Sequence, residues 1–184
     1  MQRLAAVLLT AALSLAVLWC GPRTFGQDSP KPGPEHALLK DLEGTWDATV
    51  QGEVEPGKKM ESKAVATYKL ACGGLWVVSD FKGEFAGMPF TGHGVDGYDP
   101  VKQKYTSVWV DSMSTTPLLL EGTYDKAGKK LTMAGDMTGP DRKTTRVQWV
   151  THFKDKDTMV AVMSMGGPDG KMHEAMTITY GRRK

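Results

Sequence analysis

The sequence predicts an all-β protein, an up-and-down antiparallel β-barrel of about ten strands that follows a short N-terminal helix. Runs of aromatic and β-branched residues recur at intervals of about 8 to 12 residues and end in Gly, Pro or Asp, as strands joined by tight turns do. The links are too short for parallel crossovers, which need about a dozen residues. An up-and-down barrel suits such links better than a Greek-key sandwich, and its closure removes exposed sheet edges.

The residues ahead of the first strand are expected to form an extended tether and then a short helix. Three prolines and a glycine between Gln27 and Glu35 indicate an extended chain. Residues 36–43 place three leucines on one helical face: Leu38, Leu39 and Leu42. We assign residues 27–37 to the tether and residues 38–184 to the barrel domain.

Alternation of apolar and polar residues predicts the inward face of several strands. The first strand opens at Gly44-Thr45-Trp46, and further strands are expected at residues 118–124 and 131–135. The inward residues are expected to be Met60, Ala64, Ala66, Tyr68 and Leu70 in the second strand; Val147, Trp149, Thr151 and Phe153 in residues 144–153; Met159, Ala161, Met163 and Met165 in residues 158–165; and Met172, Met176, Ile178 and Tyr180 in the last strand.

The centre of the chain is predicted to be a meander of three strands, at residues 75–85, 90–98 and 104–112. The second link, Asp99-Pro100-Val101-Lys102, has Asp at position i and Pro at position i+1 of a turn. Links of this length join antiparallel neighbours. The pattern leaves open which strand faces line the barrel between residues 90 and 112.

The first 26 residues have the pattern of a secretory signal peptide. Met-Gln-Arg precedes an uncharged apolar run from Leu4 to Trp19, whereas a transmembrane helix usually needs about 20 apolar residues. We expect cleavage after Gly26 and a periplasmic or secreted protein whose mature chain has no transmembrane helix. The alternative is a lipoprotein anchored through Cys20, which Trp19 disfavours because lipidation requires a small residue just before the cysteine.

Composition fits one globular domain and argues against a nucleic-acid partner. The 184 residues are 40% hydrophobic and 24% charged, enough for an ordinary core. Cleavage would remove two of the 23 basic residues and none of the 21 acidic ones, so the mature chain would be formally neutral. The sequence has no stripe of Lys and Arg interleaved with aromatic residues that would follow a phosphate backbone.

Cys72 would be the one cysteine of the cleaved chain, which leaves no internal disulfide. We expect Cys72 to be buried beside Gly73-Gly74, because a free Cys is usually a small core residue. A catalytic thiol normally has a His or a helix N-terminus beside it, and the sequence places neither next to Cys72.

The short helix, the Gly44-Thr45-Trp46 start and a basic residue on the last strand resemble the lipocalin and calycin pattern. In that pattern the Trp lies at the base of the barrel and an Arg packs across it, which implies structural roles for Gly44, Trp46 and Arg182. Longer sequence segments resemble the bacterial domain-of-unknown-function family 1579, which is grouped with calycin-like barrels. These segments are GTWDATV, YKLACGGLWVVSDFKGEF, GHGVDGYDP, WVDSMST, EGTYD and MTITYGRRK. The resemblance covers about residues 38–184 and implies a fold, with no established activity or catalytic residue.

His93 is the strongest candidate for chemistry, because four aspartates lie near it in the sequence: Asp80, Asp96, Asp99 and Asp111. A His with two carboxylates can bind a metal or act as a base. The structural interpretation is favoured: Asp99 belongs to a turn, Asp80 and Asp111 face solvent, and Gly92 and Gly94 let the strand bend at a barrel corner. Since the sequence also has no serine-hydrolase elbow, P-loop or dinucleotide fingerprint, we expect no catalytic residue, metal or cofactor.

We therefore expect a non-enzymatic protein that binds a small, mostly apolar ligand inside the barrel. A barrel of about eight to ten strands can hold one such molecule, and methionines suit an adaptable pocket better than a copper site. The alternatives are an enzyme or metal site around His93 and the nearby aspartates, and a solid barrel that acts as an envelope or partner-binding module. The expected ligand-binding residues are Trp46, Tyr68, Phe81, His93, Trp109, Met133, Trp149, Met163 and Tyr180.

Overall fold

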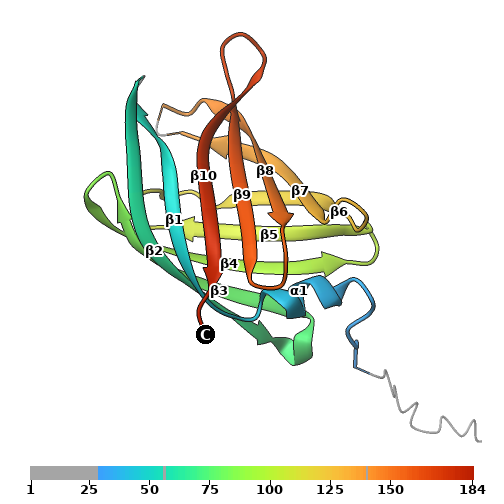
Figure 1. The fold of residues 1–184 in the computed structure, drawn as a ribbon. Coiled ribbons are helices and arrows are strands. Elements are labelled where there is room, and N and C mark those ends of the chain that lie inside the picture. The colour runs from blue at the N-terminus through green and yellow to red at the C-terminus, as the bar shows by residue number, and fades with distance from the viewer. Residues whose placement is uncertain (1–28, 56, 140) are drawn as a thin grey trace, which may run out of the picture.

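Ten antiparallel strands close a barrel in the computed structural model, which describes residues 29–55, 57–139 and 141–184 (Figure 1). Each strand pairs with its neighbours in the sequence, and β1 pairs with β10 to close the sheet. The predicted up-and-down barrel with one short helix is confirmed. The elements are α1 (His36–Leu42), β1 (Gly44–Glu55), β2 (Lys58–Ala71), η1 (Cys72–Gly74), β3 (Trp76–Phe85), β4 (Met88–Asp99), β5 (Lys104–Asp111), β6 (Leu118–Asp125), β7 (Lys130–Thr138), β8 (Thr144–Phe153), β9 (Thr158–Gly166) and β10 (Met172–Arg182).

The two ends of the barrel differ. Helix α1 lies at the end where β1 begins and β10 finishes, which we call the helix end (Figure 1). The three leucines of α1 are buried there, and the Tyr105 hydroxyl donates a hydrogen bond to the carbonyl oxygen of Glu35 (2.8 Å) just ahead of the helix. The hairpins that join β1 to β2, β3 to β4 and β9 to β10 lie at the opposite end, which we call the far end.

The predicted inward faces of β2, β8 and β9 are confirmed by burial. Ala66, Val147 and Ala161 are each at most 1% exposed, because alternate side chains of a strand point to opposite faces. The prediction for β10 is wrong at Met172, which is 40% exposed. The register shifts between Glu174 and Met176, and such a bulge reverses the alternation before it, so Met172 lies on the opposite face from Met176.

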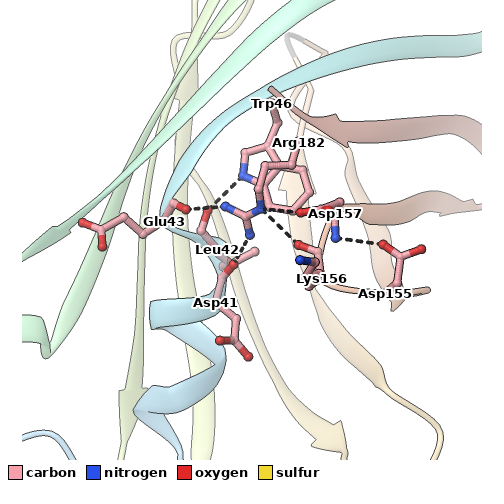
Figure 2. A network of polar contacts seen from close by, with 8 residues as sticks. All are labelled: Asp41, Leu42, Glu43, Trp46, Asp155, Lys156, Asp157 and Arg182. Atoms are coloured by element: carbon pink, nitrogen blue, oxygen red, sulfur yellow. Dashed lines mark hydrogen bonds and ion pairs between the residues drawn. The ribbon is translucent and has the colours of Figure 1, made fainter. Parts of the chain in front are cut away.

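Arg182 fastens the end of the last strand to the start of the barrel (Figure 2). Its guanidinium carbon lies 4.1 Å from the centre of the Trp46 ring, and its NH groups donate to the carbonyl oxygens of Asp41 and Glu43 (2.6 Å each). Trp46 in turn donates from its ring nitrogen to the Leu42 carbonyl oxygen (2.9 Å). These bonds satisfy carbonyl groups that the end of α1 leaves without helical partners.

The expectation that Cys72 is buried is wrong, because the residue is exposed. Cys72 begins the short turn η1, where the chain reverses between β2 and β3 at the helix end. Its φ of 51° and that of Gly73, 71°, both lie in the left-handed region that tight reversals use. The last position of β2 that packs against the core is Leu70, two residues earlier.

The expected signal peptide and Cys20 lie outside the described residues. Residues 29–33 of the expected tether form neither helix nor strand and are exposed. In the described ranges, no helix combines the length and the apolar character needed to cross a membrane.

Candidate ligand-binding cavity

The barrel is hollow and encloses a cavity of about 570 Å³. Helix α1 and all ten strands contribute to its wall, and the α1 leucines form its floor at the helix end. Toward the far end the wall includes the exposed residues Glu53, Glu84 and Met113, so the cavity opens to solvent there. The interior is therefore not packed solid, which contradicts the solid-barrel hypothesis.

The wall is mostly apolar and rich in flexible side chains. Phe81 packs edge to face against Trp109 with ring centres 6.3 Å apart, and other aromatic rings continue the wall toward both ends. Methionine adapts its unbranched side chain to irregular shapes. Among the residues that the structure describes, eight methionines reach the cavity: Met60, Met113, Met133, Met137, Met159, Met163, Met165 and Met176.

Two glycines of β4 make room for the Trp109 ring on the inner surface of the barrel. A Cβ atom at Gly92 would overlap the six-membered ring of Trp109, and one at Gly94 would overlap the hydroxyl oxygen of Ser79. Neither glycine has a positive φ, so close approach, and not a turn, requires glycine here. Gly92 and Gly94 thus shape the cavity wall in the middle of a strand.

One carboxyl group, that of Asp96, lies in the deep part of the cavity, three residues before β4 ends at the helix end. Asp96 pairs with Val77 on β3 and with Ser107 on β5. Burial raises the pKa of Asp96 to about 6, although a hydrogen bond from the Ser107 hydroxyl favours the ionised form and opposes this shift. At pH 7 the group is therefore mostly ionised inside an apolar wall.

Tyr68 and Tyr180 add two hydroxyl groups to the same region. They share a hydrogen bond, and burial together with the charge of Asp96 raises the pKa of both phenols. Both tyrosines are therefore neutral near pH 7. One O–H is used in the shared bond, the other can donate a hydrogen bond to a ligand, and both oxygens can accept one.

The remaining charged groups of the wall are also acidic. Glu53 and Glu84 line it near the far end, as does Asp111 at the end of β5. The Asp111 carboxylate accepts hydrogen bonds from the Trp109 ring nitrogen (2.9 Å) and from the Met113 backbone N–H (2.8 Å). Among the residues that the structure describes, no Lys, Arg or His lines the cavity.

Seven of the nine residues expected to bind a ligand line the cavity, and their role in binding stays a prediction. Trp46 and His93 are the exceptions. Trp46 is 2% exposed and packs under Arg182 at the barrel base, and His93 lies on the outer surface because its neighbours Gly92 and Gly94 face inward. The seven residues are Tyr68, Phe81, Trp109, Met133, Trp149, Met163 and Tyr180.

The aspartates near His93 fall on different sides of the barrel wall. The His93 Nδ1 atom lies 2.7 Å from the Asp80 carboxylate, and both side chains are more than half exposed. Asp99 accepts two backbone N–H bonds in the turn after β4, as expected. Asp96 and Asp111 face the cavity instead, so the expectation that Asp111 faces solvent is wrong. Within the described ranges, no three His, Cys, Asp or Glu side chains are grouped so that they could hold a metal.

Asp96 and Ser107 are cavity residues that the sequence analysis does not identify. The available signal is parity: Asp96 shares the face of Phe90 on β4, and Ser107 shares that of Trp109 on β5. Two glycines stand between Phe90 and Asp96, so the apolar alternation that would carry this signal is lost.

Comparison with known proteins gives a family and a fold. The sequence matches the family described as Protein of unknown function (DUF1579) over residues 31–182. The structure resembles Rv2717c from M. tuberculosis with a TM-score of 0.63 and 14% identity, covering 83% of this chain and 99% of that one. It also resembles the S-type phycobiliprotein lyase CPES from Guillardia theta with a TM-score of 0.57 and 12% identity, covering 82% and 93%. No curated protein matches the sequence. The similarities confirm the predicted calycin-like barrel.

Proposed function

The chain belongs to the DUF1579 family, and we propose that the barrel of this member binds one small, mostly apolar molecule in its cavity. The observation that carries the proposal is the cavity of about 570 Å³ with its apolar, methionine-rich wall and few polar groups. Ligand sites in proteins have this size and composition. The similar barrel of a phycobiliprotein lyase supports the proposal only through the shared fold.

We further propose that binding takes place outside the cytoplasm. The support is the sequence of residues 1–26, where a short basic start precedes an uncharged apolar run and a small-residue cleavage site. The exported chain would then meet its ligand in the periplasm or the medium.

Binding is tested with N-phenyl-1-naphthylamine, a neutral apolar dye whose fluorescence rises in an apolar environment. We expect saturable binding of one dye per chain. Met163→Trp adds volume to the wall of the cavity and should weaken binding. Val162→Trp is the matched control, because its neighbour Met163 faces inward and Val162 lies on the opposite face of β9.

The result would overturn the proposal if the dye failed to saturate, or if both tryptophan variants bound it as wild type does. Melting curves of the two variants establish that each still folds. Native mass spectrometry of the purified chain is the complementary measurement, and a retained molecule of small mass would identify the ligand directly.

A further inference from the structure

The charged groups of the cavity wall carry information about the ligand beyond its apolar character. They are Glu53, Glu84, Asp96 and Asp111, all of which are acidic. In the described part of the chain no basic side chain reaches the wall to neutralise them. We propose that the preferred ligand is an apolar molecule with a cationic amine group, and that this group binds the Asp96 carboxylate in the deep part of the cavity. This inference rests on the proposed function, since it concerns the same site.

Asp96 is the group that selects the cation, because Glu53 and Glu84 are exposed to solvent, whereas Asp96 is desolvated by burial. Asp111 already accepts bonds from Trp109 and Met113, whereas Ser107 supplies the side-chain hydrogen bond to Asp96. None of the described residues forms an ion pair with Asp96 within 4.0 Å. An ionised carboxylate in apolar surroundings is costly unless a cation pairs with it.

The surroundings of Asp96 leave room for such a partner and offer it further acceptors. The neighbours of Asp96 on adjacent strands are Val77 and Ser107, and the hydroxyl groups of Tyr68 and Tyr180 come close enough for the charge of Asp96 to act on them. An ammonium group has three N–H donors. One can bind the carboxylate while the tyrosine and serine oxygens accept the others.

The shape of the cavity sets the orientation of the ligand. The open part of the cavity is at the far end, and Asp96 lies near the floor formed by the α1 leucines. The amine would therefore enter first, past Glu53 and Glu84 near the far end, and the apolar tail would lie against the methionines above it. A molecule with a carboxylate head would be repelled along the same path, because all charges of the described wall have its sign.

The titration of Asp96 supports this geometry. Its pKa of about 6 leaves the carboxylate ionised at pH 7.5 and largely protonated at pH 5, so preference for an amine should fall on acidification. The other titratable groups that face it are Tyr68 and Tyr180, whose raised pKa values keep them neutral throughout this range, and the more distant Asp111, Glu53 and Glu84.

The experiment measures how decylamine, decanol and decanoate displace N-phenyl-1-naphthylamine at pH 7.5, each below its micelle concentration. We expect decylamine to compete about 10- to 100-fold better than decanol, the range that one hydrogen bond to a charged group supplies, and decanoate to compete worst. Asp96→Asn should remove the preference for decylamine and leave decanol unchanged or stronger. Glu84→Gln is the matched control, because it removes one carboxylate from the exposed part of the wall and should keep most of the preference.

Two outcomes would overturn the inference while the proposed function stands: decanol competing as well as decylamine in wild type, or Asp96→Asn keeping the wild-type preference while it binds the dye. If neither the dye nor any of the three decyl compounds binds, the proposed function fails and this inference fails with it. Dye affinity and thermal melting of Asp96→Asn establish that the variant is folded and that its cavity is intact.

Discussion

The guanidinium of Arg182 lies 4.1 Å from the centre of the Trp46 ring, although the last strand carries one residue and the first strand the other. The same side chain donates to carbonyl oxygens of Asp41 and Glu43, so a single residue joins β10, β1 and the end of α1. Gly44, with φ of 132°, permits this approach, because a Cβ atom there would lie 2.8 Å from the Arg182 Nη1 atom. The first and last strands are thereby fixed to each other at the barrel base.

Arg182→Ala should lower the free energy of unfolding by about 2 to 4 kcal/mol, because it removes charge-assisted hydrogen bonds and a cation over an aromatic face. Urea denaturation measures the change. Arg183→Ala is the control: Arg183 is also on the C-terminal segment and pairs with Asp47, yet both side chains are at least half exposed and such pairs contribute little. Equal effects of the two substitutions would contradict the role assigned to Arg182.

Trp46→Ala should lower the free energy of unfolding by about 3 to 5 kcal/mol, as truncation of a large buried aromatic does. The substitution also removes the hydrogen bond to the Leu42 carbonyl oxygen at the end of α1. Trp76→Ala is a useful comparison in the same denaturation experiment. Trp76 is 38% exposed, so its truncation should lower the free energy of unfolding by less. A variant at position 46 that unfolds like wild type would show that the barrel base does not depend on this ring.

The barrel could be predicted from the sequence because its signals are local. Turn residues at short intervals mark each reversal, and clear alternation in β2, β8 and β9 identifies an apolar inner face, as at Ala66, Val147 and Ala161. Alternation fails where a bulge changes the parity, as it does between Glu174 and Met176. It also says nothing about connections such as η1, where Cys72 is exposed by the geometry of the turn.

The polar part of the candidate site could not be predicted because β4 and β5 place polar residues on the inner face of the barrel, and β5 places valines on the outer face. Val108 and Val110 are 41% and 45% exposed on the outside, while Ser107 and Asp111 face the cavity. A pattern with valines at alternate positions normally places those valines in the core. Here burial on the inside comes from Trp109, whose place over Gly92 depends on contact between two strands and has no signature in either strand alone.

Gly92 and His93 are neighbours in the chain, yet Gly92→Val should be destabilising and His93→Gln should not. The valine side chain would overlap the Trp109 ring, so we expect a loss of about 1 to 3 kcal/mol and weaker dye binding as the ring moves into the cavity. His93→Gln changes an exposed pair with Asp80 and should leave stability and dye binding nearly unchanged. Thermal melting and dye titration separate them. Loss of a bound metal in His93→Gln, with unchanged melting, would instead support chemistry at His93.

The mature N-terminus is expected at Gln27 or within a few residues of it. The apolar run ends before a site whose −3 and −1 residues, Thr24 and Gly26, are small enough for cleavage. N-terminal sequencing of the protein from the periplasmic or secreted fraction checks this. A lipid-modified Cys20 at the N-terminus would show that the chain is membrane-anchored, and an intact Met1 would show that it is not processed.

Asp96 should make the empty barrel less stable as the pH rises. Its pKa of about 6 in the folded chain lies above the ordinary value of 3.8, so the folded state holds the proton more tightly than the unfolded state does. The stabilisation from that proton is complete below about pH 4 and is lost as the pH rises through about 6. A difference of about two pKa units corresponds to a change on the order of 3 kcal/mol between these limits.

Asp96→Asn removes this titration. The free energy of unfolding of the variant should therefore increase relative to that of wild type as the pH rises from 4 to 7. The bond from Ser107 is already part of the pKa of Asp96, so its loss adds no further pH dependence, and the exposed carboxylates titrate alike in both proteins. Urea denaturation of both chains at pH 4, 5, 6 and 7 measures the difference. A difference that stays constant across this range would show that Asp96 keeps an ordinary pKa and that its carboxylate is not desolvated in the empty cavity.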